Sequence, residues 1–259
     1  MKSVLLIFCL FYSLIRTAYS QGILLENMTW MEAEIALQPQ TIVVIPLGAA
    51  AKEHGPHLLL KNDFILAEYL KDRVLNESRI VMAPTINYHF YPSFLEYPGS
   101  TSLRLSTARD LVVDICRSLS KFGPKKFYVL NTGISTVRAL APAVDTLALE
   151  GIQLRYTDLR ELEPVESKIR KQEGGTHADE METSMILYMK PDAVNMKKAV
   201  KDYTPSQGRG LTRNPANKSA TYSPSGVWGD ATLATHEKGK IVTDALVQLI
   251  LKDIERMRK

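Results

Sequence analysis

The sequence predicts an α/β protein, a three-layer α/β/α sandwich around a mostly parallel central sheet. Short runs of apolar, often β-branched residues alternate along the chain with segments whose apolar residues recur at helical spacing, which is the pattern of a parallel sheet covered by helices on both faces. The chain has 259 residues, 45% of them hydrophobic, and shows no internal repeat or linker. One substantial core is therefore expected, and we predict a single domain over residues 21–259.

The first twenty residues have the features of a secretory signal peptide. A basic residue, Lys2, precedes an apolar run over residues 4–14 that is too short to span a bilayer. Small residues at Ala18 and Ser20 fit a cleavage site. An uncleaved anchor is the alternative, although Arg16 interrupts the apolar stretch. We expect cleavage near Ser20 and export of the mature protein, into the periplasm or the medium.

Charge and cysteine content narrow the choice of partners. Removal of residues 1–20 takes away Lys2 and Arg16 and no acidic residue, which lowers the formal charge from +4 to +2. This balance gives no electrostatic reason to expect a nucleic acid or a membrane surface as partner. Cys9 leaves with the signal, so Cys116 is the single thiol of the mature chain. No internal disulfide can form, and the core must supply the stability.

The regular elements follow in order. A first helix is expected over residues 27–37, and it leads into a strand over 41–47, whose apolar run is typical of a strand buried on both faces. The next helix is expected over 63–75, with Asp63 as its possible N-cap. Further strands are predicted over 78–82, 127–130 and 152–156, and further helices over 106–121 (capped by Ser106 or Thr107), 137–149, 161–173, from about 177, and over 231–257.

Two stretches are predicted to be irregular. Residues 87–99 contain two prolines, a glycine and five aromatic residues, so they form a loop that lines a pocket or contacts another subunit, or else folds onto its own core. Within them, Tyr97 could stack on a planar substrate, and so could Trp228. Residues 208–230 are rich in Gly, Pro and Ser and are expected to form a long ordered loop.

The polar residues after the strand over 41–47 are the main candidates for chemistry. Ligands of open α/β sheets bind at the carboxyl ends of the strands, where Lys52, Glu53, His54 and Asp63 are expected, with a Gly-Pro turn that can aim them at one point. Histidine and carboxylate groups supply metal ligands and acid/base catalysts. The alternative interpretation is that these residues form a solvated loop with no chemical role, and that Asp63 is simply the cap of its helix.

Two further groups of polar residues are candidates. Asn131, Thr132 and Ser135 lie in the turn between a strand and a helix, where they could bind a carboxylate or carbonyl group of a substrate, although many such turns look alike. At helical spacing His177 and Glu180 share a face and could bind a metal or pass a proton. Glu182 would then point elsewhere. First-turn acids that favour the helix dipole are the alternative.

Taken together, five motifs resemble the creatininase (creatinine amidohydrolase) family, in the family's order and over nearly all of the mature chain. The resemblance implies a three-layer α/β/α fold, a tendency to form hexamers, and metal-dependent hydrolysis of cyclic or linear amide C–N bonds. The motifs are Gly48–Asp63, Tyr97–Leu103, Asn131–Thr136, His177–Ser184 and Gly226–Thr235.

The sequence departs from the family's metal motifs, as a divergent subgroup would. The family's Glu-Gln-His-Gly-Pro-His loop implies His54 and Asp63 as ligands, but Lys52 stands at the position of the ligand Glu. In the family's Asn-Gly-His-x-x-Asn motif, Gly133 stands at the position of the ligand His. Ser135 stands where creatininase itself has a further ligand Glu.

Counting ligands predicts one metal ion rather than two. The first metal of the usual pair has lost two of its three ligands, whereas the second can be assembled from His54, Asp63 and either Glu180 or Glu53, which is the shape of a catalytic zinc site with three protein ligands. We therefore expect one divalent ion, either Zn, Mn or Fe. An ammonium at Lys52 beside Asp63 could otherwise supply the positive charge.

The leading hypothesis is an exported amidohydrolase that acts on a small-molecule amide and forms a homo-oligomer, a hexamer by the resemblance. Metal-bound water would attack the amide carbon, and His177, which matches the family's acid/base residue, would protonate the leaving nitrogen. One alternative is a catalytically inactive, metal-free binding protein on the same fold. The other is a metal-free enzyme that uses Lys52 or Glu53 directly.

Overall fold

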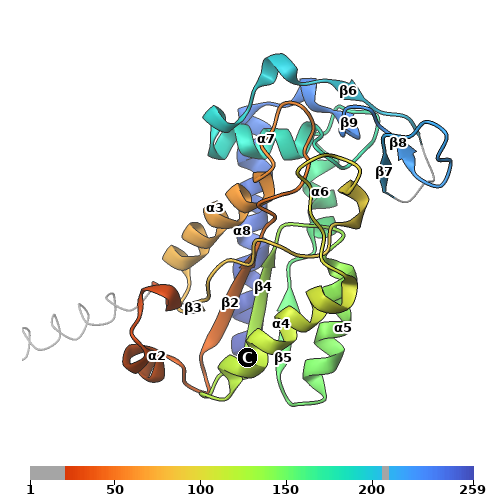
Figure 1. The fold of residues 1–259 in the computed structure, drawn as a ribbon. Helices are drawn as coiled ribbons and strands as arrows, with labels where there is room; N and C mark the ends of the chain where they lie inside the picture. The colour runs from red at the N-terminus through yellow and green to blue at the C-terminus, as the bar shows by residue number, and fades with distance from the viewer. Residues whose placement is uncertain (1–20, 206–209) are drawn as a thin grey trace, which may run out of the picture.

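A five-stranded parallel sheet forms the centre of the molecule in a computed structural model that describes residues 21–205 and 210–259 (Figure 1). Signal cleavage falls outside these residues and stays a prediction. The strand order is β1-β3-β2-β4-β5, and each neighbouring pair is parallel. The strands are β1 (Ile23–Leu24), β2 (Ile42–Leu47), β3 (Val81–Met82), β4 (Lys126–Asn131) and β5 (Gln153–Tyr156).

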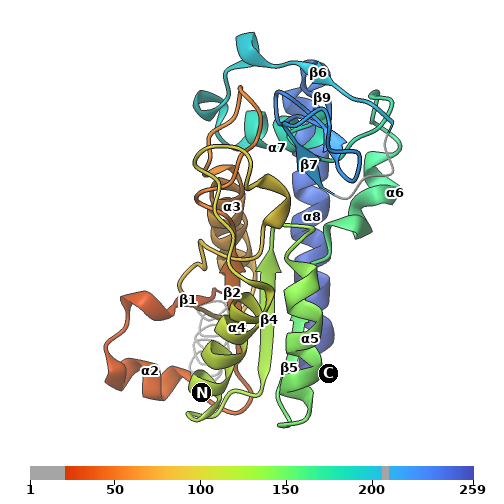
Figure 2. The ribbon, with the colours of Figure 1, turned by 45° about the vertical axis from the view of Figure 1, so that its right-hand side comes forward.

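Both faces of the sheet are covered by helices, which confirms the predicted α/β/α sandwich. In the two central strands Val43 pairs with Phe127, and both side chains pack against α4 and α5. Their neighbours Val44 and Tyr128 point to the other face and pack with α3 and α8. Figure 2 shows α4 and α5 in front of the sheet and α8 behind it. The helices are α3 (Asn62–Glu77), α4 (Leu105–Ser120), α5 (Val137–Ala148) and α8 (His236–Arg258).

The carboxyl ends of the parallel strands lie together at the upper end of the molecule in Figure 1. Short elements gather there and cover the strand ends. None of the described helices is long and apolar enough to cross a membrane. The covering elements are α7 (Glu180–Met189), β6 (Lys201–Asp202), β7 (Leu211–Thr212), β8 (Thr221–Tyr222) and β9 (Gly229–Asp230).

The predicted solvated helix over 161–173 is wrong for most of its length. A 3-10 turn, Leu159–Leu162, and one helical turn, α6 (Glu163–Glu166), are all that form. Beyond them the backbone N–H groups of Lys171 and Gln172 donate to the Glu180 carboxylate, at 2.8 and 2.7 Å, instead of continuing a helix. The backbone here is held by hydrogen bonds to the buried Glu180 carboxylate. The charged residues of this stretch give no sign of that contact in the sequence.

Helix ends also differ from prediction. Helix α2 (Trp30–Ala36) is shorter than expected because Thr29 caps it through a capping box with Glu32. Lys61 precedes α3 and Arg104 precedes α4, and neither helix has a side-chain cap. The predicted caps Asp63, Ser106 and Thr107 are therefore wrong. The closing helix begins at His236, after Thr235 caps it, and not at Ala231.

Candidate active site

The loop that follows β2 brings Lys52 and His54 onto the carboxylate of Asp63, in the first turn of α3. The Lys52 Nζ atom lies 2.7 Å from Asp63 Oδ2, and His54 Nε2 lies 2.7 Å from Asp63 Oδ1. All three side chains are buried. The Asp63 carboxylate thus contacts the Lys52 ammonium and the His54 ring, and Asp63 is not the cap of its helix.

Electrostatics keep Asp63 and Lys52 ionised. Burial alone would raise the pKa of the Asp63 carboxyl, but Lys52 and His54 together hold it well below its usual range. Burial opposes the Lys52 ammonium, yet Asp63, Glu182 and Glu53 leave its pKa above the ordinary value. His54 Nδ1 lies 2.9 Å from the Lys52 carbonyl oxygen, so both of its ring nitrogens face acceptors.

His177 approaches the trio from a different part of the chain. Its backbone pairs with Trp228 through N–H···O bonds of 3.2 and 2.8 Å, which hold it in an extended segment. Its Nε2 atom lies 3.1 Å from Glu53 Oε2, and its Nδ1 atom lies 3.6 Å from Glu182 Oε2. Burial alone would lower the pKa of His177, but these two carboxylates raise it above its usual value.

The pairing of His177 with Glu180 on one helical face is wrong, and Glu182 takes that place. Asp179 caps α7 by accepting from the N–H groups of Met181 and Glu182, both at 3.0 Å, so the helix begins only at Glu180. Because His177 lies before the helix, the helical period does not extend back to it. The pattern Asp-x-x-Glu ahead of an apolar run is an N-terminal helix signature. It is the sequence signal for a helix that begins after Asp179.

Glu180 is fully buried away from His54 and serves a structural role. Its carboxylate accepts the N–H groups of Lys171 and Gln172 and forms an ion pair with Lys238 of α8. The prediction that Glu180 is a metal ligand therefore does not agree with the structure.

A cluster that could hold a metal ion consists of His54, His177 and Glu182, whose donor atoms all lie within 4.8 Å of one another. Around a tetrahedral zinc ion, with bonds near 2.1 Å, donors stand about 3.4 Å apart, so a shift of about 1 Å would close the set. Two imidazoles and one carboxylate are also the ligand types of catalytic zinc sites. Glu53 stands outside the cluster: its Oε1 accepts the Gly55 N–H and its Oε2 holds His177.

The side chains predicted to bind substrate after β4 are used within the chain. The Asn131 amide donates to the carbonyls of Gly133 and Thr157, at 2.7 and 3.0 Å, and accepts from Thr136 Oγ1 at 2.7 Å. Asn131 is fully buried, so it fixes the turn rather than facing a substrate. The hydroxyls of Thr132 and Ser135 donate to the carbonyls of Leu47 and Phe90, at 2.9 and 3.0 Å.

The two aromatic candidates also have partners. Tyr97 is buried and its hydroxyl donates to the Ser223 carbonyl at 2.8 Å. Trp228 Nε1 donates to the Thr204 carbonyl at 3.3 Å, and the ring lies near Tyr203, with 6.2 Å between ring centroids. It is Phe94 that contacts the site, with its ring centroid 4.3 Å from that of His177.

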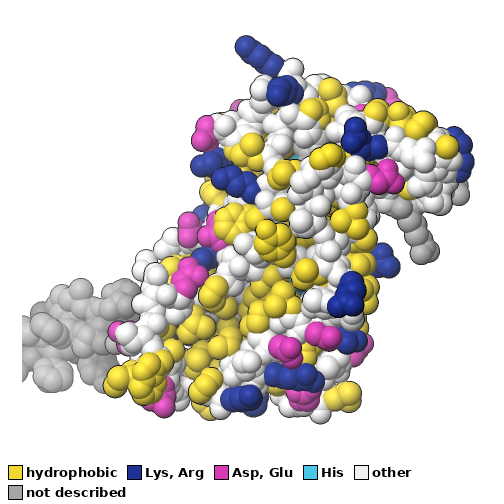
Figure 3. Space-filling view, in the orientation of Figure 1, with side chains coloured by type: hydrophobic (Ala, Val, Ile, Leu, Met, Phe, Trp, Pro, Cys, Tyr) yellow, Lys and Arg dark blue, Asp and Glu magenta, His cyan; other side chains and the backbone are white. Residues whose placement is uncertain are grey.

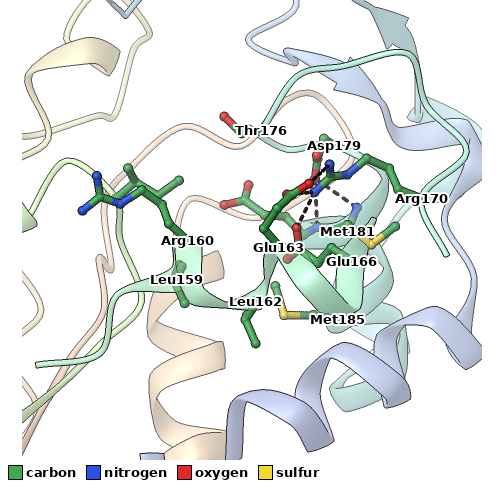
Figure 4. Close-up of a pocket in the computed structure, with 12 residues that line it drawn as sticks. Leu159, Arg160, Leu162, Glu163, Glu166, Arg170, Thr176, Asp179, Met181 and Met185 are labelled. Carbon is green, nitrogen blue, oxygen red and sulfur yellow. Dashed lines mark hydrogen bonds and ion pairs between the residues drawn. The ribbon is translucent and has the colours of Figure 1, made fainter. Parts of the chain in front are cut away.

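A cavity of roughly 310 Å³ adjoins the site (Figure 4). Glu182 belongs to both the cavity and the site. Asp179 also lines it, and burial followed by the charge of Glu182 raises the pKa of Asp179 to about 7. On the rim, Arg170 contacts Glu163 and Glu166 at 2.8 and 2.7 Å. The sequence does not reveal this cavity, because the charged residues over 161–173 have the pattern of a solvated helix. Its apolar wall consists of Ile134, Leu159, Leu162, Met181 and Met185.

Comparison with known proteins yields one family. The family profile described as "Creatininase: Creatinine amidohydrolase" matches residues 26–254. Creatinine amidohydrolase of Pseudomonas putida is 25% identical over an alignment 252 positions long, which covers 88% of this chain and 95% of the relative. The mycofactocin precursor peptide peptidase of Mycolicibacterium smegmatis is 28% identical over 221 residues, 83% of this chain and 85% of the relative.

Solved structures agree with the fold. A crystal structure of creatinine amidohydrolase (creatininase) superimposes with a TM-score of 0.76 at 23% identity, covering 92% of this chain and 98% of the other. Similar structures include a creatininase described with Mn and a creatininase mutant described as Zn-Zn type, with TM-scores of 0.75 and 0.72.

Proposed function

The chain belongs to the creatininase family of amidohydrolases, and we propose that it hydrolyses an amide C–N bond of a small molecule with the help of one divalent metal ion. The observation that carries the proposal is the group of His54, His177 and Glu182 at the carboxyl edge of the sheet, directly beside a cavity. In open α/β sheets this edge is where ligands bind.

His54, His177 and Glu182 are the residues that would hold the ion. A bound divalent metal polarises a carbonyl oxygen and lowers the pKa of bound water, which makes water a nucleophile near neutral pH. The protein supplies orientation, because Glu53 Oε2 lies 3.1 Å from Nε2 of His177 and leaves Nδ1 on the side of Glu182. The family resemblance implies His177 as the proton donor instead. The two roles exclude one another, because a ring that binds the ion through Nδ1 and contacts Glu53 through Nε2 has no proton directed at a leaving nitrogen.

The cavity is where the rest of the substrate would lie. Its volume of roughly 310 Å³ suits a small molecule, and Leu159, Leu162, Met181 and Met185 offer it an apolar wall. Glu182 belongs to both the cavity and the metal cluster, so a substrate seated here would present its amide to the cluster. The relatives support the reaction type, since one is named for creatinine and another for a precursor peptide.

The test is hydrolysis by the purified protein after loading with Zn²⁺, Mn²⁺ or Fe²⁺, followed as amine or ammonia release from a panel of cyclic amides, formamides and short peptides. We expect turnover of at least one class. His177→Asn should lower it by at least about 100-fold, since general acid–base catalysis contributes 10²- to 10⁴-fold. The control is His89→Gln, which changes another buried histidine outside the cluster.

The metal content of the His177→Asn protein separates the two roles of this residue. Loss of the ion identifies a ligand, and retention with lost activity identifies the proton donor. Binding of amides without hydrolysis under any metal would replace the proposal with the alternative of a metal-free small-molecule binding protein.

A further inference from the structure

A buried ammonium lies in the middle of the candidate active site. Lys52 is 4% exposed, and its Nζ atom lies 2.7 Å from Asp63 Oδ2. The same atom lies 4.9 Å from the ring centroid of Phe94 and 5.6 Å from that of Tyr91. Its charge is therefore held between one carboxylate and two aromatic faces, which attract cations.

Asp63 would otherwise be a metal ligand. It is 1% exposed, and its Oδ1 atom lies 2.7 Å from Nε2 of His54, which belongs to the metal cluster. An ion bound to the His54 ring would come within reach of the carboxylate. Yet one oxygen of Asp63 is occupied by the Lys52 ammonium and the other by the His54 ring.

Displacing Lys52 from Asp63 is costly. An ion that took the carboxylate would leave the ammonium beside Phe94 and Tyr91 without its anionic partner, and a buried charge that loses its partner is strongly destabilising. The ammonium would also stand within a few ångströms of a dication and repel it. The ion pair and a metal at Asp63 therefore exclude one another.

We infer that the Lys52 ammonium prevents Asp63 from binding a metal ion. The site therefore takes one divalent ion, on the side of His177 and Glu182, and no second ion at Asp63. The inference rests on the proposed function for the presence of that first ion. It assigns Asp63 to orienting His54 through Nε2 and not to metal coordination.

Zinc binding by calorimetry, together with metal content after dialysis, tests this in variants of the full protein. Lys52→Gln frees Asp63 and should bind Zn²⁺ at least about tenfold more tightly or take a further equivalent, because even at the dielectric constant of water a unit charge a few ångströms from a dication changes its affinity by that factor. Lys52→Arg keeps the charge and should bind as the wild type does.

The double variant Lys52→Gln with Asp63→Asn gives the sharper comparison. It replaces an ion pair by a neutral pair of similar shape, which buried sites often tolerate, so it should fold even where Lys52→Gln alone does not. Thermal unfolding reports the folding of each protein. If Asp63 only orients His54 and is not a ligand, zinc affinity in the double variant should fall by less than about 100-fold relative to the wild type.

A loss of at least about 100-fold in the double variant would show that Asp63 binds the metal in the wild type, and would overturn the inference. Wild-type affinity and stoichiometry in Lys52→Gln would overturn it as well. A wild type that binds no zinc at all would reject the metal-dependent function, whereas zinc uptake by Lys52→Gln would still support the role of Lys52.

Discussion

At the scale of single residues, the ionised groups of the site are paired across long stretches of sequence. Glu53 holds His177, 124 positions away, and Glu180 holds Lys238, 58 positions away. Buried charges persist only when such partners neutralise them. The Glu180–Lys238 pair joins helix α7 to helix α8, and the Glu53–His177 pair joins two segments of the site. The geometry of the site therefore depends on segments that are distant in sequence.

His89 predicts a pH dependence of stability that does not involve the metal cluster. Burial lowers the pKa of His89 to about 4, and its Nε2 atom lies 3.0 Å from the Ala108 carbonyl oxygen. A histidine in the unfolded chain titrates near 6.5. Between about pH 6.5 and pH 4 this histidine thus binds more protons in the unfolded state than in the folded state. The stability that His89 contributes is therefore complete above that window and falls as pH drops through it, by up to about 1.4 kcal/mol per pH unit.

Urea unfolding at pH 7, 6 and 5 checks this prediction. His89→Gln should show a shallower loss of unfolding free energy than the wild type. Some slope should remain, because burial and the charge of His54 also lower the pKa of His57 to about 4. The exposed His236, changed to Gln, is the matched control and should keep the full slope. Identical slopes for His89→Gln and the wild type would contradict the assignment.

Single residues of the site were predicted where local chemistry decided their position. Lys52, His54 and Asp63 were expected at one point because a strand end and a Gly-Pro turn put them there, and the structure brings them together. Glu182 was not predicted to face His177, because the helical period was applied from His177 onward. The helix begins only after Asp179, which caps it. The partner of Lys52 could be guessed from sequence, but that of Glu180, on α8, depends on tertiary packing.

At the scale of elements, α7 and α8 pack closely at Gly239. A Cβ atom added to Gly239 would lie 1.8 Å from the Ser184 carbonyl oxygen. Alanine is ordinarily favoured over glycine within a helix by about 1 kcal/mol, but here the methyl group would force α8 away from α7. We expect Gly239→Ala to lower the free energy of unfolding by about 1–3 kcal/mol, as overpacking does.

Chemical denaturation measures this effect, with Lys240→Ala at the next, exposed position as the control. The control should change stability little, since the site is exposed and alanine is a good helix former. A more stable Gly239→Ala protein would mean that the two helices have room to separate at this point.

Elements were predictable in proportion to their length. The strands β2 and β4 and the helices α3, α4, α5 and α8 each carry enough residues to show a period or an apolar run. The two-residue strands β6 to β9 show neither. Strands β6 and β9 form because the segment around Trp228 pairs with His177 and with residues near Lys201, which are remote in sequence. Strands β7 and β8 pair with each other.

At the scale of the whole molecule, α2 projects from the body and exposes apolar side chains (Figure 3). Trp30 is 75% and Ile35 76% exposed, and no residue of α2 is buried. Exposed apolar patches of this kind mark interfaces. We expect two copies of the chain to associate through this helix, which accords with the homo-oligomer anticipated from the sequence.

Light scattering coupled to gel filtration at micromolar concentration measures the association. The wild type should exceed the mass of one chain, and Trp30→Ser with Ile35→Lys should shift it towards the monomer. Leu149→Ser, which changes an exposed apolar residue outside α2, should leave the assembly intact. A monomeric wild type would remove the case for self-association through this face.

The last helix has a practical consequence for work with this protein. Helix α8 has 23 residues and so runs for about 34 Å. Near its start, Lys238 pairs with Glu180 close to the site. At its end, Arg258 donates to the Arg79 carbonyl at 2.7 Å. The carboxyl terminus thus lies at the opposite end of the molecule from the cavity (Figure 1). A purification handle, a fluorophore or a surface linker joined after Lys259 would leave the cavity clear.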